Sequence, residues 1–485
     1  MAGDRLESIL RTSRVIGGAA AIIAAFGARA EDCGKLAAIK LPHGTVTRAE
    51  EVSETGATKL AYCRVQATSK PTADSDIRFE LWIPLGPAWN GKFEQVGNGG
   101  FAGAIPSRTM AHALSLGFAV AGTDDGHQSA DNIDASWALN HEEKVKDYGW
   151  RAISETTLAS KQILRHFKST PAAKAYFVGC SDGGREALMM AQRFPRYFDG
   201  IVAGAPAYAM SRLLTSGALR SARLSSVEGR LTSAKLALLQ ASALKSCGNG
   251  ARYLKDPRQC RPDLAALECT NAETDACLTQ AQIETAKLIY QEQKDPASGV
   301  PLYAVLPGAE GVKGSWDAWL TGSDDGAKPA ALGFTWNYLA YMVMDDPHYD
   351  PAKVTNADIA RGELHYAPIM DASDPDLSAF KAHGGKLIQY HGWNDPGIPP
   401  GYSLEYRARV AATMGQVDDF YRLYMVPGML HCGGGDAPTN VDWLTAIEAW
   451  VEKGTPPGTL VASDAQGGTQ TVLPFSSSAA SAENQ

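Results

Sequence analysis

The chain has 485 residues, of which 45% are hydrophobic and 20% are charged, so it can fold as one large domain with an insertion or as two domains. Its net charge of −8 comes without any basic block or stripe, which argues against a nucleic-acid-binding protein and against binding to anionic membranes. Beyond solubility, the acidity itself indicates little.

The first thirty residues have the pattern of a secretory signal peptide. Its basic residues are Arg5, Arg11 and Arg14. The apolar run at 15–27 is shorter than the ~20 residues of a membrane span, and Ala-Arg-Ala at 28–30 fits a signal-peptidase site. We therefore expect a signal peptide at 1–30, a mature chain that starts near Glu31 without a membrane anchor, and export to the periplasm or the extracellular medium.

All the cysteines lie in the predicted mature part, and an even number in an exported protein favours disulfides over free thiols. No C-x-x-C pair is present, which argues against a thiolate zinc site. The sequence alone does not fix the connectivity. Pairing of neighbours along the chain gives Cys33–Cys63, Cys247–Cys260 and Cys269–Cys277, and it leaves Cys180 for Cys432.

The N-terminal half alternates between strand-like and helix-like segments. Phe79, Leu81 and Ile83 share one face at period two, which predicts a strand at 78–84. This alternation predicts an α/β fold with a largely parallel sheet. The next expected elements are a strand and glycine-rich loop at 91–100, a strand at 117–127, a helix at 151–168, a strand ending at 180, a helix ending before Pro195, and a strand and turn at 198–207.

A short motif stands where one of these strands meets a helix. Residues 179–183 read Gly-Cys-Ser-Asp-Gly and match G-x-S-x-G, in which the glycines permit a tight turn that projects the serine from the sheet edge. The pentapeptide alone is a weak signal, because it also fits a plain strand-to-helix turn with a capping serine. As a nucleophile elbow, it makes Ser181 the nucleophile.

A serine nucleophile needs a base and an acid that orients the base, which in α/β-hydrolases follow it in the order Ser, Asp, His at strand ends. Asp395 and His431 each follow an expected strand downstream of Ser181. Order, spacing and position at strand ends therefore predict a Ser181–Asp395–His431 triad. His391, near the same acid, is a competing base.

An acyl-transfer enzyme also needs donors for the developing oxyanion. The backbone N–H of Asp182, directly after the nucleophile, is the first candidate. The glycine-rich loop at 97–101 is the candidate for the second donor, with the Gly100 N–H favoured and Gly99 next. A plain flexible turn is the alternative for this loop.

The pattern changes between 212 and 375, where helical turns lead into four clustered cysteines and then into an aromatic, proline- and glycine-rich region. Such a segment between two stretches of one α/β pattern predicts an inserted lid. The expected organisation is a catalytic domain at 31–211 and 376–465, a lid domain at 212–375 and a flexible tail at 466–485. Candidates for stacking on an aryl acyl group, although such residues more often form a lid core, are Trp316, Trp319 and Trp336.

Four motifs together resemble the tannase and feruloyl esterase family: GCSDGGREAL at the elbow, FDGIVAGAPA after it, GWNDPGIPP at the acid and PGMLHCGGG at the base. The resemblance runs from about Cys33 to Trp450. It implies an α/β-hydrolase core with a large inserted lid. It also implies the roles of nucleophile, acid and base for Ser181, Asp395 and His431.

The resemblance extends to disulfides and calcium. It implies a Cys180–Cys432 disulfide beside nucleophile and base, and the other three neighbouring cysteine pairs fit the family as well. The family's aspartate-rich calcium loop corresponds here to CGNGARYLKDPRQC between Cys247 and Cys260, where Asp256 is the only carboxylate. Because calcium takes about six to eight oxygen ligands, we expect this site to be lost and the protein to need no metal or other cofactor.

These observations predict a secreted serine carboxylic-ester hydrolase that cleaves small aromatic-acid esters of the feruloyl or hydroxycinnamoyl type through an acyl-enzyme. Galloyl esters and terephthalate monoesters are the alternative substrates, and the sequence does not rank them. Peptide hydrolysis by the same triad and an exported binding module on a hydrolase fold are the competing functions. The complete set of Ser181, Asp395 and His431 argues against a binding module, which has no need of all three.

Overall fold

The structure is a computed structural model that describes residues 32–56 and 58–476. The described residues belong to one compact unit, Asp32–Gln485. The predicted signal peptide at 1–30 lies outside them.

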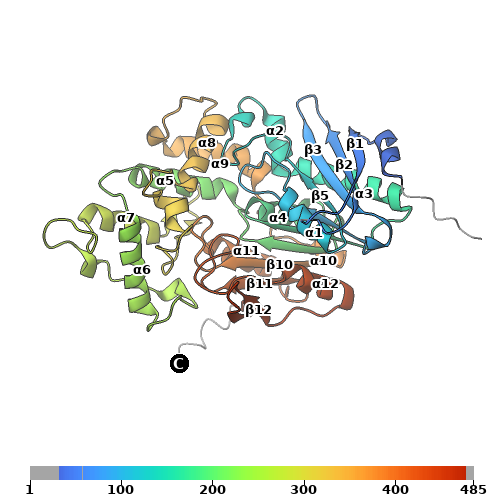
Figure 1. Ribbon diagram of the computed structural model, residues 1–485. Coiled ribbons are helices and arrows are strands. Elements are labelled where there is room, and N and C mark those ends of the chain that lie inside the picture. The colour runs from blue at the N-terminus through green and yellow to red at the C-terminus, as the bar shows by residue number, and fades with distance from the viewer. Residues whose placement is uncertain (1–31, 57, 477–485) are drawn as a thin grey trace, which may run out of the picture. The chain divides into compact units, whose positions relative to one another are not determined.

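A nine-stranded mixed sheet forms the centre of the fold, in the order β1-β2-β3-β5-β4-β6-β7-β10-β11 (Figure 1). The strands from β1 to β3 pair antiparallel with one another and with β5, whereas β5, β4, β6, β7, β10 and β11 run parallel. The predicted α/β class with a largely parallel sheet is confirmed. The strands are β1 (Gly44–Val52), β2 (Tyr62–Ser69), β3 (Ile77–Pro84), β4 (Lys92–Val96), β5 (Ala119–Thr123), β6 (Lys174–Cys180), β7 (Gly200–Gly204), β10 (Lys386–Gly392) and β11 (Tyr421–Val426).

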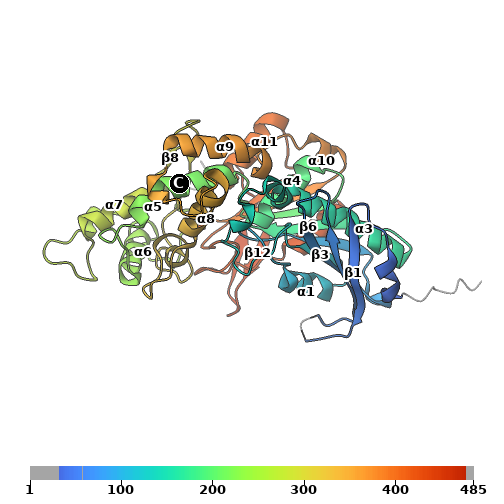
Figure 2. The same ribbon diagram turned by 90° about the horizontal axis from the view of Figure 1, so that it is seen from above.

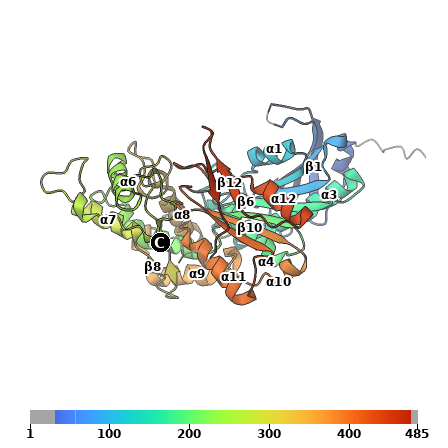
Figure 3. The same ribbon diagram turned by 90° about the horizontal axis from the view of Figure 1, so that it is seen from below.

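Helices cover both faces of this sheet, because alternate residues of the central strands are apolar on opposite sides. The covering helices are α1 (Ser107–Ser115), α3 (Ala152–Lys168), α4 (Asp182–Arg193), α10 (Ser378–Ala382), α11 (Gly401–Met414) and α12 (Trp443–Lys453). In β6, Phe177 packs in the hydrophobic cluster of α3 and α4, whereas Tyr176 packs in that of α1 and α12. Figure 3 shows α1 and α12 on one side of β6 and β10, with α4, α10 and α11 on the other. Among the described residues, no helix has both the length and the apolar character that crossing a membrane requires.

The chain between β7 and β10 is a long insertion, residues 205–385. Its helices α6 and α7 pack around a separate hydrophobic cluster that includes Leu239, Ile283 and Trp316. In Figures 1 and 2, α5 and α8 lie between α6–α7 and α4. The lid predicted at 212–375 falls within this insertion. Apart from α10, the elements of the insertion are α5 (Met210–Leu224), α6 (Ser233–Cys247), α7 (Gln280–Tyr290), β8 (Gln293–Lys294), β9 (Pro301–Leu302), α8 (Ala330–Tyr338) and α9 (Asn356–Met370), and α9 contacts the short α2 (Glu142–Lys146).

The C-terminal segment is ordered farther than expected. β12 (Leu460–Ser463) and β13 (Thr469–Val472) form an antiparallel pair, and the Phe475 N–H donates to Leu423 O at 2.7 Å. The flexible tail predicted from residue 466 is therefore wrong for 466–476. The polar composition of this segment gives no strand signal, although residues 469–472 pair with β12.

Four disulfides join all the cysteines in the described part of the chain. The pairs are Cys33–Cys63, Cys180–Cys432, Cys247–Cys260 and Cys269–Cys277. The connectivity obtained by pairing neighbours, with one long-range pair left over, is confirmed. Because disulfides form and persist in oxidising compartments, these four indicate a protein that is exported from the cytoplasm.

Candidate active site

Ser181 stands in a strained turn between β6 and α4. Its φ is +66° and its ψ is −121°, a conformation that a non-glycine residue rarely adopts. The glycines around it are required by close packing: a Cβ on Gly179 would lie 2.3 Å from Gly183 O, and a Cβ on Gly184 would lie 2.2 Å from Gly204 O. The Ser181 N–H donates to Gly204 O at 3.0 Å. The strand, turn and helix that G-x-S-x-G predicts are therefore present.

His431 and Asp395 form a direct pair. The His431 Nδ1 lies 2.8 Å from Asp395 Oδ2, and Asp395 Oδ1 accepts the backbone N–H groups of Gly397 at 2.9 Å and Ile398 at 2.8 Å. Burial on its own would raise the pKa of Asp395, but the neighbouring His431 and the hydrogen bond from His391 outweigh it and hold this pKa below its usual value. Asp395 is therefore an ionised acceptor that fixes the orientation of the imidazole.

His391 does not reach the pocket and supports the acid instead. It is fully buried, and its Nε2 lies 2.8 Å from Ile398 O and 3.3 Å from Asp395 Oδ2. Its Nδ1 lies 2.6 Å from the Ser403 hydroxyl. In the tautomer that satisfies these contacts, Nε2–H donates to Ile398 O and faces Asp395. Both ring nitrogens are engaged, so the competing assignment of His391 as base is not supported.

The Cys180–Cys432 disulfide brings Ser181 and His431 to one edge of the sheet. The two cysteines are 252 residues apart in sequence, and their Cα atoms are 5.9 Å apart. The His431 Nε2 is buried and has no hydrogen-bond partner in the described part of the chain. The His431–Asp395 pair is thus formed, whereas no hydrogen bond joins His431 to Ser181 among the described residues.

The two predicted oxyanion donors lie at the same pocket as Ser181. Gly100, with φ +61°, and Asp182 both line this pocket. A Cβ on Gly100 would lie 2.5 Å from Asn132 O, so only glycine fits. The Tyr148 hydroxyl lies 3.0 Å from Gly100 O and 2.8 Å from Asp182 Oδ1, which ties the two segments together. Within residues 32–56 and 58–476, neither the Gly100 N–H nor the Asp182 N–H has an acceptor.

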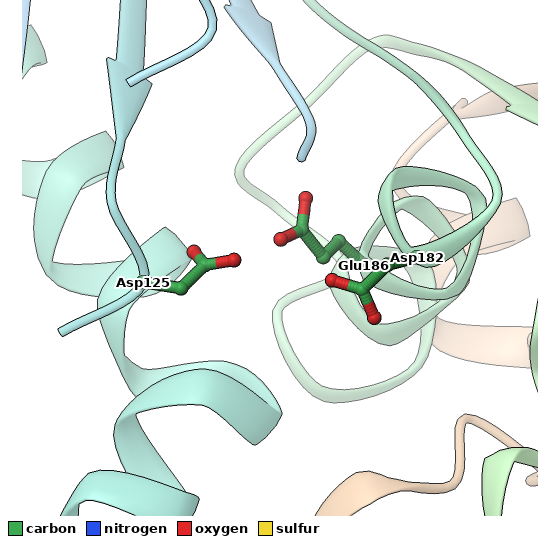
Figure 4. Close-up of side chains that lie close together, drawn as sticks. All are labelled: Asp125, Asp182 and Glu186. Atoms are coloured by element: carbon green, nitrogen blue, oxygen red, sulfur yellow. The ribbon is translucent and has the colours of Figure 1, made fainter. Parts of the chain in front are cut away.

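Three buried carboxylates lie directly behind the elbow. Figure 4 shows the carboxylates of Asp125, Asp182 and Glu186 close together. One carboxylate oxygen of each residue lies within 4.8 Å of those of the other two. Burial raises the pKa of Asp125 well above its usual value and that of Glu186 to about 7. The Arg185 Nε donates to Asp182 Oδ1 at 2.6 Å. Arg185 and retained protons therefore balance the charge of this cluster.

A pocket that is partly open to solvent is lined by Ser181 and by residues of the insertion. Apart from Asp182 at the elbow, Arg220 is the one charged side chain among its lining residues. Most of its wall is apolar, which suits an aromatic or aliphatic group more than a peptide or sugar. Representative wall residues are Phe101, Leu213, Ile289, Val305, Trp319 and Phe334.

Of the three tryptophans predicted to stack on substrate, Trp319 alone lines the pocket, and its ring centroid lies 4.6 Å from that of His431. Trp316 is 1% exposed and packs in the hydrophobic cluster of α6 and α7. Trp336 is half-buried and carries Lys328 over its ring. Trp316 thus belongs to the core of the insertion, the alternative already open for these residues, and neither Trp316 nor Trp336 is among the residues that line the pocket.

Most of the residues that line the pocket were not predicted from the sequence, among them Phe101, Phe334 and Arg220. Phe101 directly follows the predicted donor Gly100, so the glycine-rich loop carried a signal for it. Phe334 and Arg220 belong to helices of the insertion, where no local pattern marks a residue that faces the pocket.

The segment between Cys247 and Cys260 offers little to a calcium ion. Its one carboxylate, Asp256, accepts the Arg258 N–H at 3.1 Å and the Arg258 Nε–H at 2.9 Å. A carboxylate paired with arginine is a poor ligand for a cation. The expectation that the family's calcium site is lost rests on this donor set.

A mixed sheet with helices on both faces and a serine on a strained turn between strand and helix defines an α/β-hydrolase. A model of the tannase and feruloyl esterase family matches residues 63–479, and the chain belongs to that family. It is a carboxylic ester hydrolase of the family.

Individual relatives agree with this assignment. The chain is 35% identical over 512 residues to an uncharacterized esterase of Xanthomonas campestris, covering 94% of this chain and 88% of that protein. It is 32% identical over 453 residues to the mono(2-hydroxyethyl) terephthalate hydrolase of Piscinibacter sakaiensis, covering 79% and 74%. The crystal structure of feruloyl esterase B from Aspergillus oryzae superposes with a TM-score of 0.83 at 27% identity, covering 92% of this chain and 95% of the other.

Proposed function

We propose that the protein is an exported serine esterase that cleaves esters of aromatic acids, with feruloyl and related hydroxycinnamoyl esters as its first substrate class. The observation that carries this proposal is the His431–Asp395 pair, which the Cys180–Cys432 disulfide links to the elbow residue Ser181 in the wall of an apolar pocket. Galloyl esters and terephthalate monoesters are the alternative acyl groups for the same machinery.

In the proposed reaction, His431 Nε2 takes the proton of Ser181 Oγ as this oxygen attacks the ester carbonyl. Asp395 stabilises the imidazolium that forms. The tetrahedral oxyanion accepts hydrogen bonds from the backbone N–H groups of Asp182 and Gly100. His431 then protonates the leaving alcohol, and a water activated by His431 releases the acid from Ser181. The unpartnered His431 Nε2 and the two free N–H groups support these roles.

The insertion acts in this proposal as a lid over the acyl pocket. Its segment 212–375 supplies most of the pocket wall beyond the elbow, including Trp319, which covers the edge of His431. Closing the site against water strengthens every electrostatic interaction inside it. The domain bounds of 31–211 with 376–465 for the catalytic part and 212–375 for the lid belong to the same proposal.

The test is product release by the purified mature protein and its Ser181→Ala variant on methyl ferulate, methyl gallate, monomethyl terephthalate and p-nitrophenyl acetate. We expect rapid cleavage of at least one aromatic ester and a loss of more than about 10³-fold in kcat in the variant. Activity on p-nitrophenyl acetate alone would keep the mechanism and remove the acyl-group assignment. Equal rates for both proteins would overturn the serine mechanism and favour a binding module.

A further inference from the structure

Arg220 is a buried cation in the wall of the acyl pocket. It lies on α5, is 7% exposed and lines the same pocket as Ser181. Burial lowers the pKa of its guanidinium, which still remains charged near neutral pH. An arginine in such a place normally pairs with a carboxylate, because an isolated buried charge is costly.

No carboxylate in the described part of the chain forms an ion pair with Arg220. Its Nη1 donates to the Ser216 hydroxyl, and its Nη2 lies 3.3 Å from Gln291 O and 3.5 Å from Tyr303 O. The buried Nε has no hydrogen-bond partner among the described residues. The charge is therefore solvated by neutral groups only, two of them at long distance.

A second arginine of the same helix has the counter-ion that Arg220 lacks. The Arg212 Nη2 donates to Glu405 Oε2 at 2.7 Å, and Arg212 does not line the pocket. A carboxylate acceptor is thus within reach of α5, yet it is committed to the arginine outside the pocket. The cation inside the pocket is the one left without a counter-charge.

Arg220 leans along α5 toward the end of the helix that is nearer to Ser181. The Ala207 N–H donates to Ser181 O at 3.1 Å, and α5 starts three residues later at Met210. Helical side chains lean toward the N-terminus, and the contact with Ser216 shows that Arg220 does so. Ser216 lies about 9 Å along the helix from Met210, given a rise of 1.5 Å per residue. The charge is therefore displaced from the Arg220 Cα toward the end of α5 that is nearer to the elbow, and Arg220 and Ser181 line the same pocket.

We infer that Arg220 forms a carboxylate-binding subsite in the acyl pocket, so that the preferred acyl group is an aromatic acid with a second, free carboxylate opposite the ester. This inference rests on the proposed function and selects a substrate class within it. Arginine suits this role because its planar fork binds a carboxylate bidentately. The apolar walls around it, such as Leu213 and Ile289, exclude water and strengthen the ion pair.

The experiment compares kcat/KM for monomethyl terephthalate and dimethyl terephthalate, which differ at the far end of one ring by a charge. We expect Arg220→Gln to lower the ratio of the two values by about 10- to 100-fold, because a charged hydrogen-bonded pair is lost. The ratio for Arg220→Lys should lie between those of the wild type and Arg220→Gln, since lysine keeps the charge without the planar fork of the guanidinium. Arg223→Gln, which removes a positive charge from α5 outside the pocket, is the matched control and should leave the ratio unchanged.

An equal loss on both esters, or no loss, would overturn the inference and leave Arg220 as a tie between α5 and the carbonyls of Gln291 and Tyr303. If Arg220→Gln does not fold, inhibition of the wild-type enzyme decides. Terephthalate should then inhibit at least about 10-fold more tightly than benzoate, and equal inhibition would contradict the subsite. Hydrolysis of p-nitrophenyl acetate separates the proposed serine esterase from the proposed subsite. If only the subsite is wrong, the wild-type protein still hydrolyses this ester and the Ser181→Ala variant does not.

Discussion

Glu186 lies one helical turn after Asp182 on α4, and its buried carboxylate faces those of Asp125 and Asp182. Burial, followed by the charge of Asp182, raises the pKa of Glu186 from 4.5 to about 7. Between pH 4.5 and pH 7, the Glu186 carboxyl is therefore mostly protonated in the folded state and mostly ionised in the unfolded chain. The stabilisation from Glu186 is fully present below pH 4.5 and is lost as the pH rises through 7.

We expect Glu186→Gln to remove this part of the pH dependence of stability. Glutamine keeps an acceptor for the Asn98 N–H and can donate to Asp125 without carrying a charge. The Tm of the variant relative to the wild type should therefore rise by a few °C between pH 5 and pH 8. Thermal unfolding across this range is the measurement, with Glu284→Gln at the surface as the control. A Tm difference that stays constant with pH would contradict the expectation.

At the scale of single residues, the sequence predicts what a local pattern determines. Ser181, Asp395 and His431 could be proposed as a triad because each follows a strand and stands in a recognisable turn. Arg220 could not be found, because its place at the pocket depends on how α5 packs against the sheet and the rest of the insertion. Trp319 belongs to the pocket and Trp316 to the core of the insertion, a difference that composition and spacing do not reveal.

Among the elements, the contact of α4 with β7 sets the position of the elbow. A Cβ on Gly184 would lie 2.2 Å from Gly204 O and 2.9 Å from the Cα of Pro206. Both are backbone atoms, so they cannot turn aside as a flexible side chain does. The helix that begins directly after Ser181 can approach the sheet this closely only with glycine at position 184.

We therefore expect Gly184→Ala to destabilise the protein by about 1–3 kcal/mol and to lower kcat, since the added methyl group pushes α4 and the elbow away from β7. Urea unfolding and ester hydrolysis measure the two effects. Gly458→Ala is the matched control, because a Cβ at Gly458 meets no atom within 4 Å. A variant with wild-type stability and rate would show that the elbow does not depend on this packing.

Elements with a clear apolar period were predicted most accurately. The predicted strand at 78–84 and helix at 151–168 match β3 (Ile77–Pro84) and α3 (Ala152–Lys168) within one residue at each end, and their apolar residues repeat with clear periods. The edge strand β1 (Gly44–Val52) was not predicted. Its outer face is exposed and carries charges at Arg48 and Glu50, which hide the strand period.

At the scale of the whole molecule, the Cys180–Cys432 disulfide links two parts of the sheet that are far apart in the sequence. Cys180 ends β6 and Cys432 follows β11, and β7 and β10 lie between these strands. The two cysteines are separated by 252 positions in the chain, and the entire insertion lies between them. The link therefore ties the residue before Ser181 to the residue after His431 across the whole insertion.

We expect the double variant Cys180→Ala with Cys432→Ala to lose about 3–5 kcal/mol of stability, because a long loop of the unfolded chain is no longer closed. It should also lose kcat at a temperature where it remains folded, since Ser181 and His431 then depend on loop packing alone. The control is Cys247→Ala with Cys260→Ala, which opens a link of 13 residues in the insertion and should lower stability without lowering kcat. Equal kcat in both double variants would make the long-range disulfide a stabiliser only, with no part in positioning the base.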